Sequence, residues 1–261
     1  MTTGDLLRIS LLGPLLAGCT VPRVKPTAWP RADIVVAHDS TGTYHTINEA
    51  LVRARDGMII LVRPGVYQEQ VKLDRAGRVS LLSIDPAATI IDASDKYAAI
   101  EIKTDGNRIS GFTLRNADSH GVWVRDGHQI IDHCLVVNNG ERGIYLSAMV
   151  GNASAQIDHC TVADNGESGI HAARDSAGTV ITNSIIAYNP SGIVTDRSAG
   201  FMTIDFNCLY NRLVDFDRVI PGGHNIVGDP EFIDRTGGNY LLKRGSPAAR
   251  ADANGANLGC F

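Results

Sequence analysis

A repeated glycine phrase predicts an all-β fold, a right-handed parallel β-helix (solenoid) with an N-terminal capping helix. The phrase recurs four times, as GVWV at Gly121, GIYL at Gly143, GIHA at Gly169 and GIVT at Gly192. The spacings are 22, 26 and 23 residues, without helical periodicity between the copies. A repeat this short, rich in single apolar residues and asparagine, fits one coil of a β-helix better than a pair of helices.

Aligned on these glycines, the repeats predict columns of residues that stack from coil to coil. Each repeat is expected to hold two short β runs separated by a turn residue, with alternate side chains pointing the same way. The expected core columns are Ile131, Ile157 and Ile181, then Val136, Val162 and Ile186, then Ile144, Ile170 and Ile193. A column of Asn139, Asn165 and Asn189 is expected at tight corners, where asparagine tolerates a left-handed backbone and an internal amide ladder can form.

The stretch before the clear repeats predicts a cap. Residues 46–55 place Ile47, Ala50, Leu51 and Ala54 on one helical face. A helix here would cover the open end of the solenoid, where a strand edge is otherwise unpaired.

The N-terminus predicts export. Residues 1–18 carry Arg8 before a short apolar stretch that is too short to span a bilayer, as in a cleaved signal peptide. Its ending, Leu16-Ala17-Gly18-Cys19, resembles the bacterial lipobox, in which the cysteine is diacylated and becomes the mature N-terminus. The resemblance implies membrane anchoring through lipid on Cys19. An ordinary secretory signal is the alternative.

The expected location and domain organisation follow from this export signal. Thr20 rather than aspartate follows the cysteine, which under the lipobox resemblance favours the outer membrane of a Gram-negative bacterium. Residues 19–32 would be the lipidated cysteine and a Pro-rich tether, and residues 33–261 a single β-helix domain.

Composition argues against nucleic-acid binding and leaves open whether the cysteines form disulfides. The 261 residues carry a formal net charge of -4 without a clustered basic surface, so we expect no nucleic-acid binding. Cys134, Cys160 and Cys208, with Ser184 between the last two, are expected to form a ladder of small side chains inside the solenoid, with a disulfide as the alternative. No Cys/His spacing matches a zinc site, and no metal ligand is predicted.

The predicted cap resembles the opening of pectin methylesterases. Asp39, the Thr46-Ile47-Asn48-Glu49-Ala50 segment and the Gly65-Val66-Tyr67-Gln68-Glu69 strand match that family's Val-Ala-x-Asp, Thr-Ile-x-Glu-Ala and Gly-x-Tyr-x-Glu patterns. The resemblance implies a capped β-helix of the pectate lyase-like superfamily. In the family's alignment Arg142 and Ser168 stand where both catalytic aspartates would be, so pectin demethylation is not expected.

Two further segments resemble relatives of the same superfamily. The phrase Ile-Asp-His-Cys, at His133 and His159, is similar to the Trp-Ile-Asp-His motif of pectate lyases. Its recurrence, with Asn183 and Asn207 assigned to the same column, favours a structural turn over catalysis. Residues 225–261 resemble the ends of secreted bacterial β-helix proteins and are expected to close the last coils.

One outward column is the main candidate site. Trp123, Tyr145 and His171 each follow an aligned glycine by two residues, so they should lie on neighbouring coils about 4.8 Å apart and face the same way. Sugar faces can pack on such a platform, and Arg125 beside it could pair with a uronate carboxylate. The alternative is that this column packs under a loop or a neighbouring chain.

Two other groupings are weaker candidates. Glu141 and Glu167 share a turn position, and two carboxylates about 5 Å apart could supply an acid beside a base; exposed turns in water are the alternative. His120, His128 and Tyr145 could serve a β-elimination beside a uronate carboxylate.

These observations predict an exported β-helix lipoprotein that binds a polysaccharide. The expected ligand is an acidic uronate polymer, processed by lyase or epimerase chemistry. Tyr145 and His171 are the expected acid and base, and Arg125 is the carboxylate partner. Trp123, Arg142 and His120 would add substrate contacts. We expect no cofactor, with calcium left open. A noncatalytic glycan-binding or structural surface scaffold is the alternative.

Overall fold

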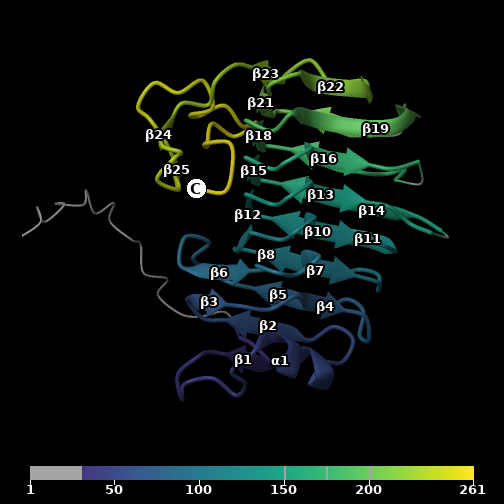
Figure 1. The fold of residues 1–261 in the computed structure, drawn as a ribbon, viewed down its shortest axis with the longest axis vertical. Helices are drawn as coiled ribbons and strands as arrows, with labels where there is room; N and C mark the ends of the chain where they lie inside the picture. Colours follow the sequence, from purple (N-terminus) through teal and green to yellow (C-terminus); the bar gives the residue numbers. More distant parts are fainter. Residues whose placement is uncertain (1–30, 150, 175, 200–201) are drawn as a thin grey trace, which may run out of the picture.

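The chain winds into a solenoid of stacked coils, which a computed structural model describes for residues 31–149, 151–174, 176–199 and 202–261 (Figure 1). Three parallel sheets run along its axis. Sheet A contains β1 (Ile34–Val36), β2 (Ile59–Val62), β5 (Ser80–Leu82), β8 (Arg108–Ser110), β11 (Gly127–Asp132), β14 (Ala153–Asp158), β17 (Val180–Thr182) and β20 (Thr203–Asp205). This architecture confirms the predicted all-β parallel β-helix.

The other two sheets complete each coil. Sheet B contains β3 (Gly65–Tyr67), β6 (Thr89–Asp92), β9 (Thr113–Arg115), β12 (Leu135–Val137), β15 (Thr161–Ala163), β18 (Ile185–Ala187), β21 (Cys208–Tyr210) and β23 (Ile226–Val227). Sheet C contains β4 (Val71–Leu73), β7 (Ala98–Ile102), β10 (His120–Val124), β13 (Arg142–Leu146), β16 (Ser168–Ala172), β19 (Ser191–Ala199) and β22 (Val214–Val219). A full coil therefore has three strands, where the sequence predicted two runs.

The core columns lie as predicted. Ile131 pairs with Ile157, which pairs with Ile181, and all three are fully buried. The valine column of sheet B and the isoleucine column of sheet C pair in the same way. Each buried aliphatic side chain contributes roughly 1.5–3 kcal/mol of transfer free energy. Repetition of a few buried positions therefore supplies most of the driving force for folding.

Close packing explains the glycine in the repeated phrase. A Cβ on Gly143 would lie 2.4 Å from Cγ1 of Val162 and 2.6 Å from the carbonyl oxygen of Gly169. Gly121 and Gly169 would meet equivalent side chains of sheet B at 2.3 and 2.4 Å. Only a residue without a side chain fits where sheet C begins against the core.

The asparagine column forms the predicted internal ladder. Asn165 accepts hydrogen bonds from the backbone and the side-chain amide of Asn139, at 3.2 and 3.0 Å, and donates from Nδ2 to Oδ1 of Asn189 at 3.1 Å. The left-handed backbone lies one residue earlier than predicted, at Asn138, Asp164 and Tyr188. The ladder residues thus pair buried backbone groups at the corner and leave the backbone reversal to their exposed or half-buried neighbours.

The predicted cap is α1 (Ile47–Arg53). Thr46 and Glu49 form a reciprocal capping box at its start. Glu69 of the following coil also accepts hydrogen bonds from the backbone amides of Ile47 and Asn48, at 2.8 and 3.0 Å. These contacts anchor the helix over the first coil, where its apolar face is buried.

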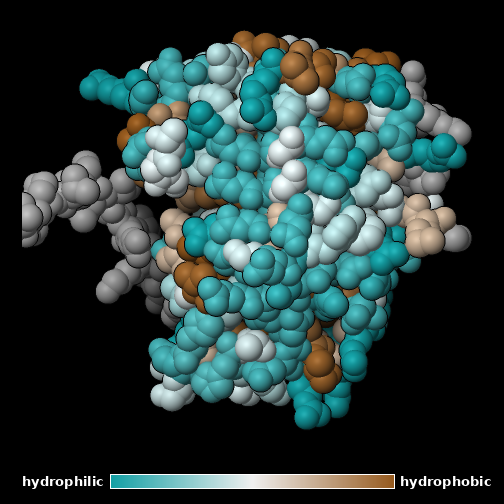
Figure 2. Space-filling view, in the orientation of Figure 1, coloured by the Kyte–Doolittle hydropathy of each residue, from teal (hydrophilic) through white to brown (hydrophobic). Residues whose placement is uncertain are grey.

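The opposite end of the solenoid presents apolar side chains to solvent. Leu213, Ile220 and Val227 are 81%, 70% and 66% exposed. Figure 2 shows apolar side chains gathered at this end, over β22 and β23. The two ends of the stack therefore differ in surface chemistry.

The cysteine ladder is one coil shorter than predicted. The column that contains Cys160 and Ser184 continues with Asn207 and not with Cys208. The backbone amide of Cys160 donates to Ser184, and that of Ser184 donates to Oδ1 of Asn207 at 3.0 Å. Cys208 instead pairs with Ile185 in sheet B. The assignment of Asn207 to the column of His133 was wrong for the same reason, because Phe206 has the left-handed backbone of that column. Cys134, Cys160, Cys208 and Cys260 are buried free thiols.

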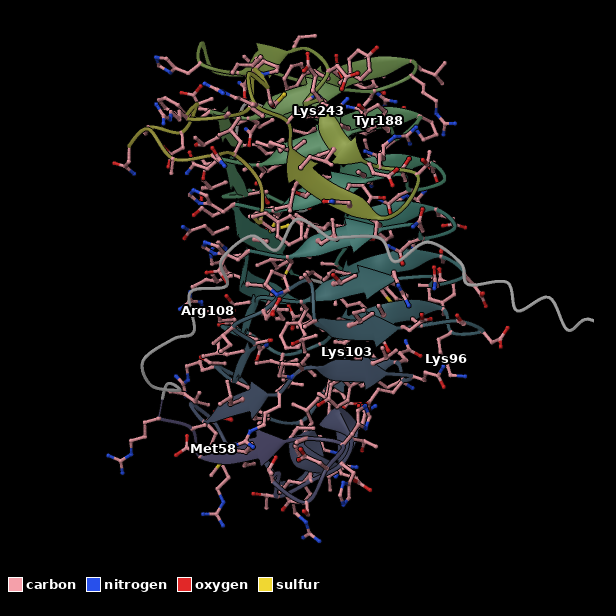
Figure 3. All side chains as sticks on the ribbon, turned by 90° about the vertical axis from the view of Figure 1, so that its left-hand side faces the viewer. Met58, Lys96, Lys103, Arg108, Tyr188 and Lys243 are labelled. Carbon is pink, nitrogen blue, oxygen red and sulfur yellow. The ribbon has the colours of Figure 1, made fainter. Side chains whose placement is uncertain are left out.

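The predicted C-terminal closure holds for the start of the segment, where β23 pairs with β21 in the last coil, but the rest lies beside the solenoid. Residues 228–261, with the antiparallel hairpin of β24 (Phe232–Asp234) and β25 (Asn239–Leu242), lie against sheet B (Figures 1 and 3). Phe232 and Leu258 pack in one apolar cluster with Leu135 and Ile185. The prediction was wrong for residues 228–261 because turn residues show where the chain reverses but not which surface it covers.

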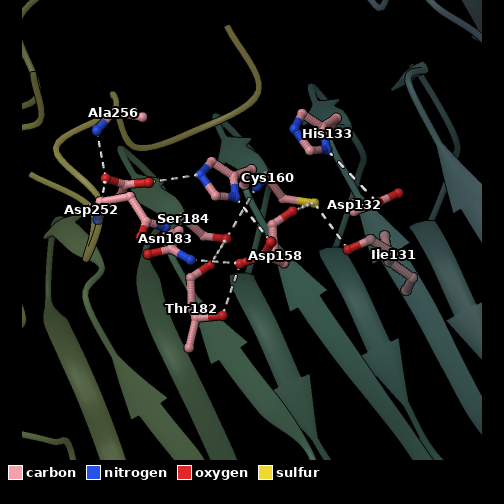
Figure 4. A network of polar contacts seen from close by, with 12 residues as sticks. Ile131, Asp132, His133, Asp158, Cys160, Thr182, Asn183, Ser184, Asp252 and Ala256 are labelled. Atoms are coloured by element: carbon pink, nitrogen blue, oxygen red, sulfur yellow. Dashed lines mark hydrogen bonds and ion pairs between the residues drawn. The ribbon is translucent and has the colours of Figure 1, made fainter. Parts of the chain in front are cut away.

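The two histidines of the repeated Ile-Asp-His-Cys phrase have structural contacts. Their rings stack at 5.2 Å between centroids and 7° between planes. His159 lies between Asp158, 2.9 Å from its Nδ1, and Asp252 of the C-terminal segment, 3.4 Å from its Nε2 (Figure 4). His159 therefore bridges the solenoid to the segment that covers it.

The expected signal peptide, residues 1–18, and the expected lipidation site Cys19 lie outside the described residues. No described helix is long and apolar enough to cross a membrane.

The ladder predicts a local test of stability. Asn165→Ala should lower the free energy of unfolding by about 3 kcal/mol or more, because several buried backbone and amide groups lose their partners at once. Urea unfolding of the purified variant measures this. Gln156→Ala, at an exposed position of β14, should change stability by no more than about 0.5 kcal/mol. Equal effects of the two substitutions would contradict the role of the ladder.

Candidate functional site

The outer face of sheet C brings the predicted aromatic column together. Trp123 of β10 pairs with Tyr145 of β13, which pairs with His171 of β16. In register, Glu101 of β7 precedes Trp123 in the same column. Glu101 was missed in the sequence because the glycine phrase begins one coil later.

The rings form a tilted platform. Trp123 and Tyr145 stack with centroids 6.5 Å apart and 16° between planes, whereas His171 meets Tyr145 edge-on at 5.3 Å. All three side chains are half-buried. The platform therefore offers two roughly parallel ring faces followed by a polar edge.

His120 lies beneath this platform. It is 1% exposed and contacts Tyr97, Trp123 and Tyr145, with ring centroids 5.3, 5.7 and 4.8 Å away. Burial, reinforced by the nearby charge of Arg142, lowers the pKa of His120 to about 4. His120 is therefore neutral at physiological pH and supports the rings from below.

Arg142 is the centre of a polar network. Its Nη1 and Nη2 donate to Glu141 and Glu167, each at 2.8 Å, and its Nε donates to Nδ1 of His171 at 3.0 Å. The guanidinium also lies 4.6 Å from the centre of the Tyr145 ring. The expected pair of repelling carboxylates is thus bridged by one cation. Their shared turn position was predicted, whereas Arg142 was expected to contact substrate and instead bridges the two carboxylates.

This network defines the tautomer of His171. Because Nδ1 accepts a hydrogen bond from Arg142, the proton of the neutral ring is on Nε2, which donates to Asp196 at 2.8 Å. Both ring nitrogens are therefore engaged. By contrast, the Tyr145 hydroxyl has no hydrogen bond within the described residues.

Arg125 lies at the other end of the platform. Its guanidinium is 4.5 Å from the centre of the Trp123 ring, and Nη1 donates to Glu101 at 2.8 Å. Burial opposes ionisation of Glu101, but hydrogen bonds from Arg125 and Lys103 outweigh it and lower the pKa of this carboxyl. A depression of about 270 Å³ adjoins this end, lined by Lys103, Arg125, Asp126 and Met149.

Two buried polar atoms on this face have no hydrogen-bond partner within the described residues. They are Nε1 of Trp123 and Oγ of Ser168, the residue paired with Arg142. An unsatisfied buried polar atom costs about 1–3 kcal/mol. Such a cost is tolerated where ordered water or a ligand completes a site.

The structure separates one predicted grouping. His128 lies on β11 in sheet A, where Nδ1 is 2.9 Å from Oγ of Ser154. It does not join His120 and Tyr145, so the expected elimination set is not assembled. Among the described residues no group of three or more His, Cys, Asp or Glu side chains could hold a metal ion.

Comparison with known proteins agrees with the architecture. Residues 98–218 match the family model described as "Right handed beta helix region". A probable pectinesterase/pectinesterase inhibitor 58 of Arabidopsis thaliana is 32% identical over 111 residues, which cover 39% of this chain and 19% of the relative. The chain thus spans about a fifth of the length of this curated relative.

Two solved structures are similar at low identity. Pectin methylesterase from carrot has a TM-score of 0.46 at 17% identity, over 72% of this chain and 66% of that chain. Pectate lyase Pel9A has a TM-score of 0.40 at 11% identity, over 84% and 91%. Together with the three parallel sheets, the family match confirms that this is a right-handed parallel β-helix protein.

The buried histidine gives a pH prediction. The folded pKa of His120, about 4, lies below the value of about 6.5 in an unfolded chain. The stability that comes from its burial is therefore present above pH 6.5 and is lost as the pH falls towards 4. NMR titration should show the His120 ring protonating near pH 4, with His120→Gln assigning the signal. A midpoint near 6.5 would contradict burial of the ring.

Proposed function

We propose that the outer face of sheet C binds a polysaccharide. The observation that carries this proposal is the pair of nearly parallel, half-exposed rings of Trp123 and Tyr145 on adjacent coils. Sugar rings pack their apolar faces on such aromatic surfaces, while the surrounding charged side chains can bond to hydroxyl groups. A relative named as a pectinesterase, although matched over a small part of its length, supports a glycan ligand.

The contacts favour binding without chemistry. His171 has both nitrogens engaged, His120 is buried, and Arg142 is paired with two carboxylates. A general base must reach the proton that it removes. None of these three groups is free to do so in the arrangement described, so a glycan-binding module is the better supported function.

Lyase or epimerase chemistry on a uronate polymer is the second candidate. It is favoured by Tyr145, whose hydroxyl makes no hydrogen bond within the described residues while Arg142 lies over its ring. In that reaction Tyr145 and His171 would move protons beside the substrate carboxylate, and Arg125 would pair with the carboxylate.

We further infer that the protein is exported and lipid-anchored through Cys19, with residues 33–261 as one β-helix domain. The support is the lipobox-like ending of residues 1–18 and the Pro-rich residues that follow. A glycan-binding face held near the outer membrane is consistent with a partner at the cell envelope.

The platform predicts a binding defect. Trp123→Ala should weaken polysaccharide binding at least about 10-fold, equivalent to about 1.4 kcal/mol, because a ring face is removed. Affinity electrophoresis against a panel of acidic and neutral polysaccharides measures it. His133→Asn removes an exposed ring elsewhere, keeps a residue that tolerates the left-handed backbone, and should bind normally. Equal binding by Trp123→Ala and the unsubstituted protein would exclude this face.

The second candidate has its own test. Elimination creates an unsaturated uronate that absorbs ultraviolet light, so absorbance on uronate polymers, with and without calcium, reports a lyase. Tyr145→Phe should then abolish turnover while preserving binding, because only the hydroxyl is lost. Full turnover in Tyr145→Phe would exclude Tyr145 as the acid or base. Product analysis by NMR tests epimerisation separately.

A further inference from the structure

The charged side chains on the outer face of sheet C are sorted by sign along the solenoid axis. The coils from β4 to β10 carry Lys72, Arg75, Lys103 and Arg125 against Asp74, Glu101 and Asp126. The coils from β13 to β22 carry Glu141, Glu167, Asp196 and Asp217 against Arg142, Arg174 and Arg218. We call these the basic half and the acidic half of the face.

Exposure sharpens this division. In the basic half Glu101 is only 9% exposed, below the more exposed side chains of Lys103 and Arg125, at 40% and 26%. In the acidic half the order is reversed. Arg142 is 18% exposed, while the Glu141 and Glu167 that it pairs with are 46% and 50% exposed. A ligand on the face would therefore meet cations at one end and carboxylates at the other.

The two halves are close enough to act on one ligand. Arg125 follows the end of β10, whereas Glu141 and Glu167 precede β13 and β16, so the groups are offset across the sheet. Adjacent coils are about 4.8 Å apart, so along the axis the β10 and β16 coils are separated by roughly 10 Å. This distance is comparable to the screening length of about 8 Å at physiological ionic strength. The rings of Trp123 and Tyr145 lie across the boundary and would hold neighbouring sugar units in place.

We propose that this face selects a glycan in which uronate and uncharged sugars alternate, bound in one direction. This rests on the proposed glycan-binding function. A uronate carboxylate lies against Arg125 and Lys103 of the basic half. The uncharged unit lies over the acidic half, where its hydroxyls donate to carboxylate oxygens that Arg142 leaves free, Oε1 of Glu141 and Oε2 of Glu167.

A uronate homopolymer fits this face less well. It would place a second carboxylate over Glu141, Glu167 and Asp196, and such like-charge contacts weaken binding and disfavour the wrong partner. A fully neutral glycan would offer Arg125 and Lys103 no carboxylate beyond that of Glu101. Selectivity for a mixed chain therefore follows from repulsion at one end and attraction at the other.

Calorimetry with three oligosaccharides of equal length tests the proposal. The probes are a hyaluronan oligosaccharide, which alternates glucuronate and N-acetylglucosamine, an oligogalacturonate, and a neutral cello-oligosaccharide. The alternating probe should bind at least about 10-fold tighter than either of the others. Arg125→Gln should reduce this affinity about 10-fold and leave the neutral probe unaffected.

Substitutions in the acidic half should act in the opposite direction. The double variant Glu141→Gln and Glu167→Gln should bind oligogalacturonate about 10-fold tighter. Asp196→Asn keeps the acceptor oxygen for His171 and should give a smaller gain in affinity for oligogalacturonate. This single variant replaces the double variant if the latter is unstable. Glu231→Gln, an exposed residue of the C-terminal segment, is the matched control and should change nothing.

The outcomes separate the two proposals. Equal or tighter binding of oligogalacturonate or of the neutral probe to the unsubstituted protein would overturn the charge-sorted selection but leave glycan binding intact. Failure of all three probes to bind would overturn both the glycan-binding function and this inference.

Discussion

In-register pairing of parallel strands is the constraint on which the rest of the structure depends. Adjacent coils lie about 4.8 Å apart, and each inward residue rests on the equivalent residue of the coil below. The asparagine ladder and the repeated glycine fix this register. A shift by one residue would leave a buried asparagine amide unpaired and would force a Cβ into the core at the glycine position. The same register stacks the outward side chains, so the aromatic platform is a consequence of the core.

Much of the fold could be predicted because short sequence patterns determine the register of the strands. The glycine phrase, the isoleucine columns and the capping box are local patterns, and each lies where the sequence indicates. Errors occurred where periodicity changes. Cys208 lies one position beyond the column assigned to it, because the pairing of Ser184 with Asn207 depends on the lengths of the intervening turns. The position of the C-terminal segment depends on long-range packing, such as Phe232 against Leu135, which no local pattern encodes.

For the candidate site, too, the residues that share a column could be predicted, but the contacts between columns could not. Trp123, Tyr145 and His171 share a column, which follows from register alone. The ion pairs do not, because they join different columns through long side chains: Arg142 reaches from one column to His171 in the next, and Glu101 draws in Arg125. These contacts decide which groups are free. They make His171, one of the two expected acid and base residues, part of a polar network around the rings, whereas the Tyr145 hydroxyl makes no hydrogen bond within the described residues.

Tryptophan fluorescence tests the central claim, that a glycan occupies this face, most directly. The chain has two tryptophans, Trp29 and Trp123, so Trp29→Phe leaves the platform as the single reporter. We expect a saturable change in Trp123 emission during glycan titration, with the same dissociation constant as calorimetry gives. Calorimetric binding without any change in Trp123 emission would place the ligand elsewhere and contradict the account.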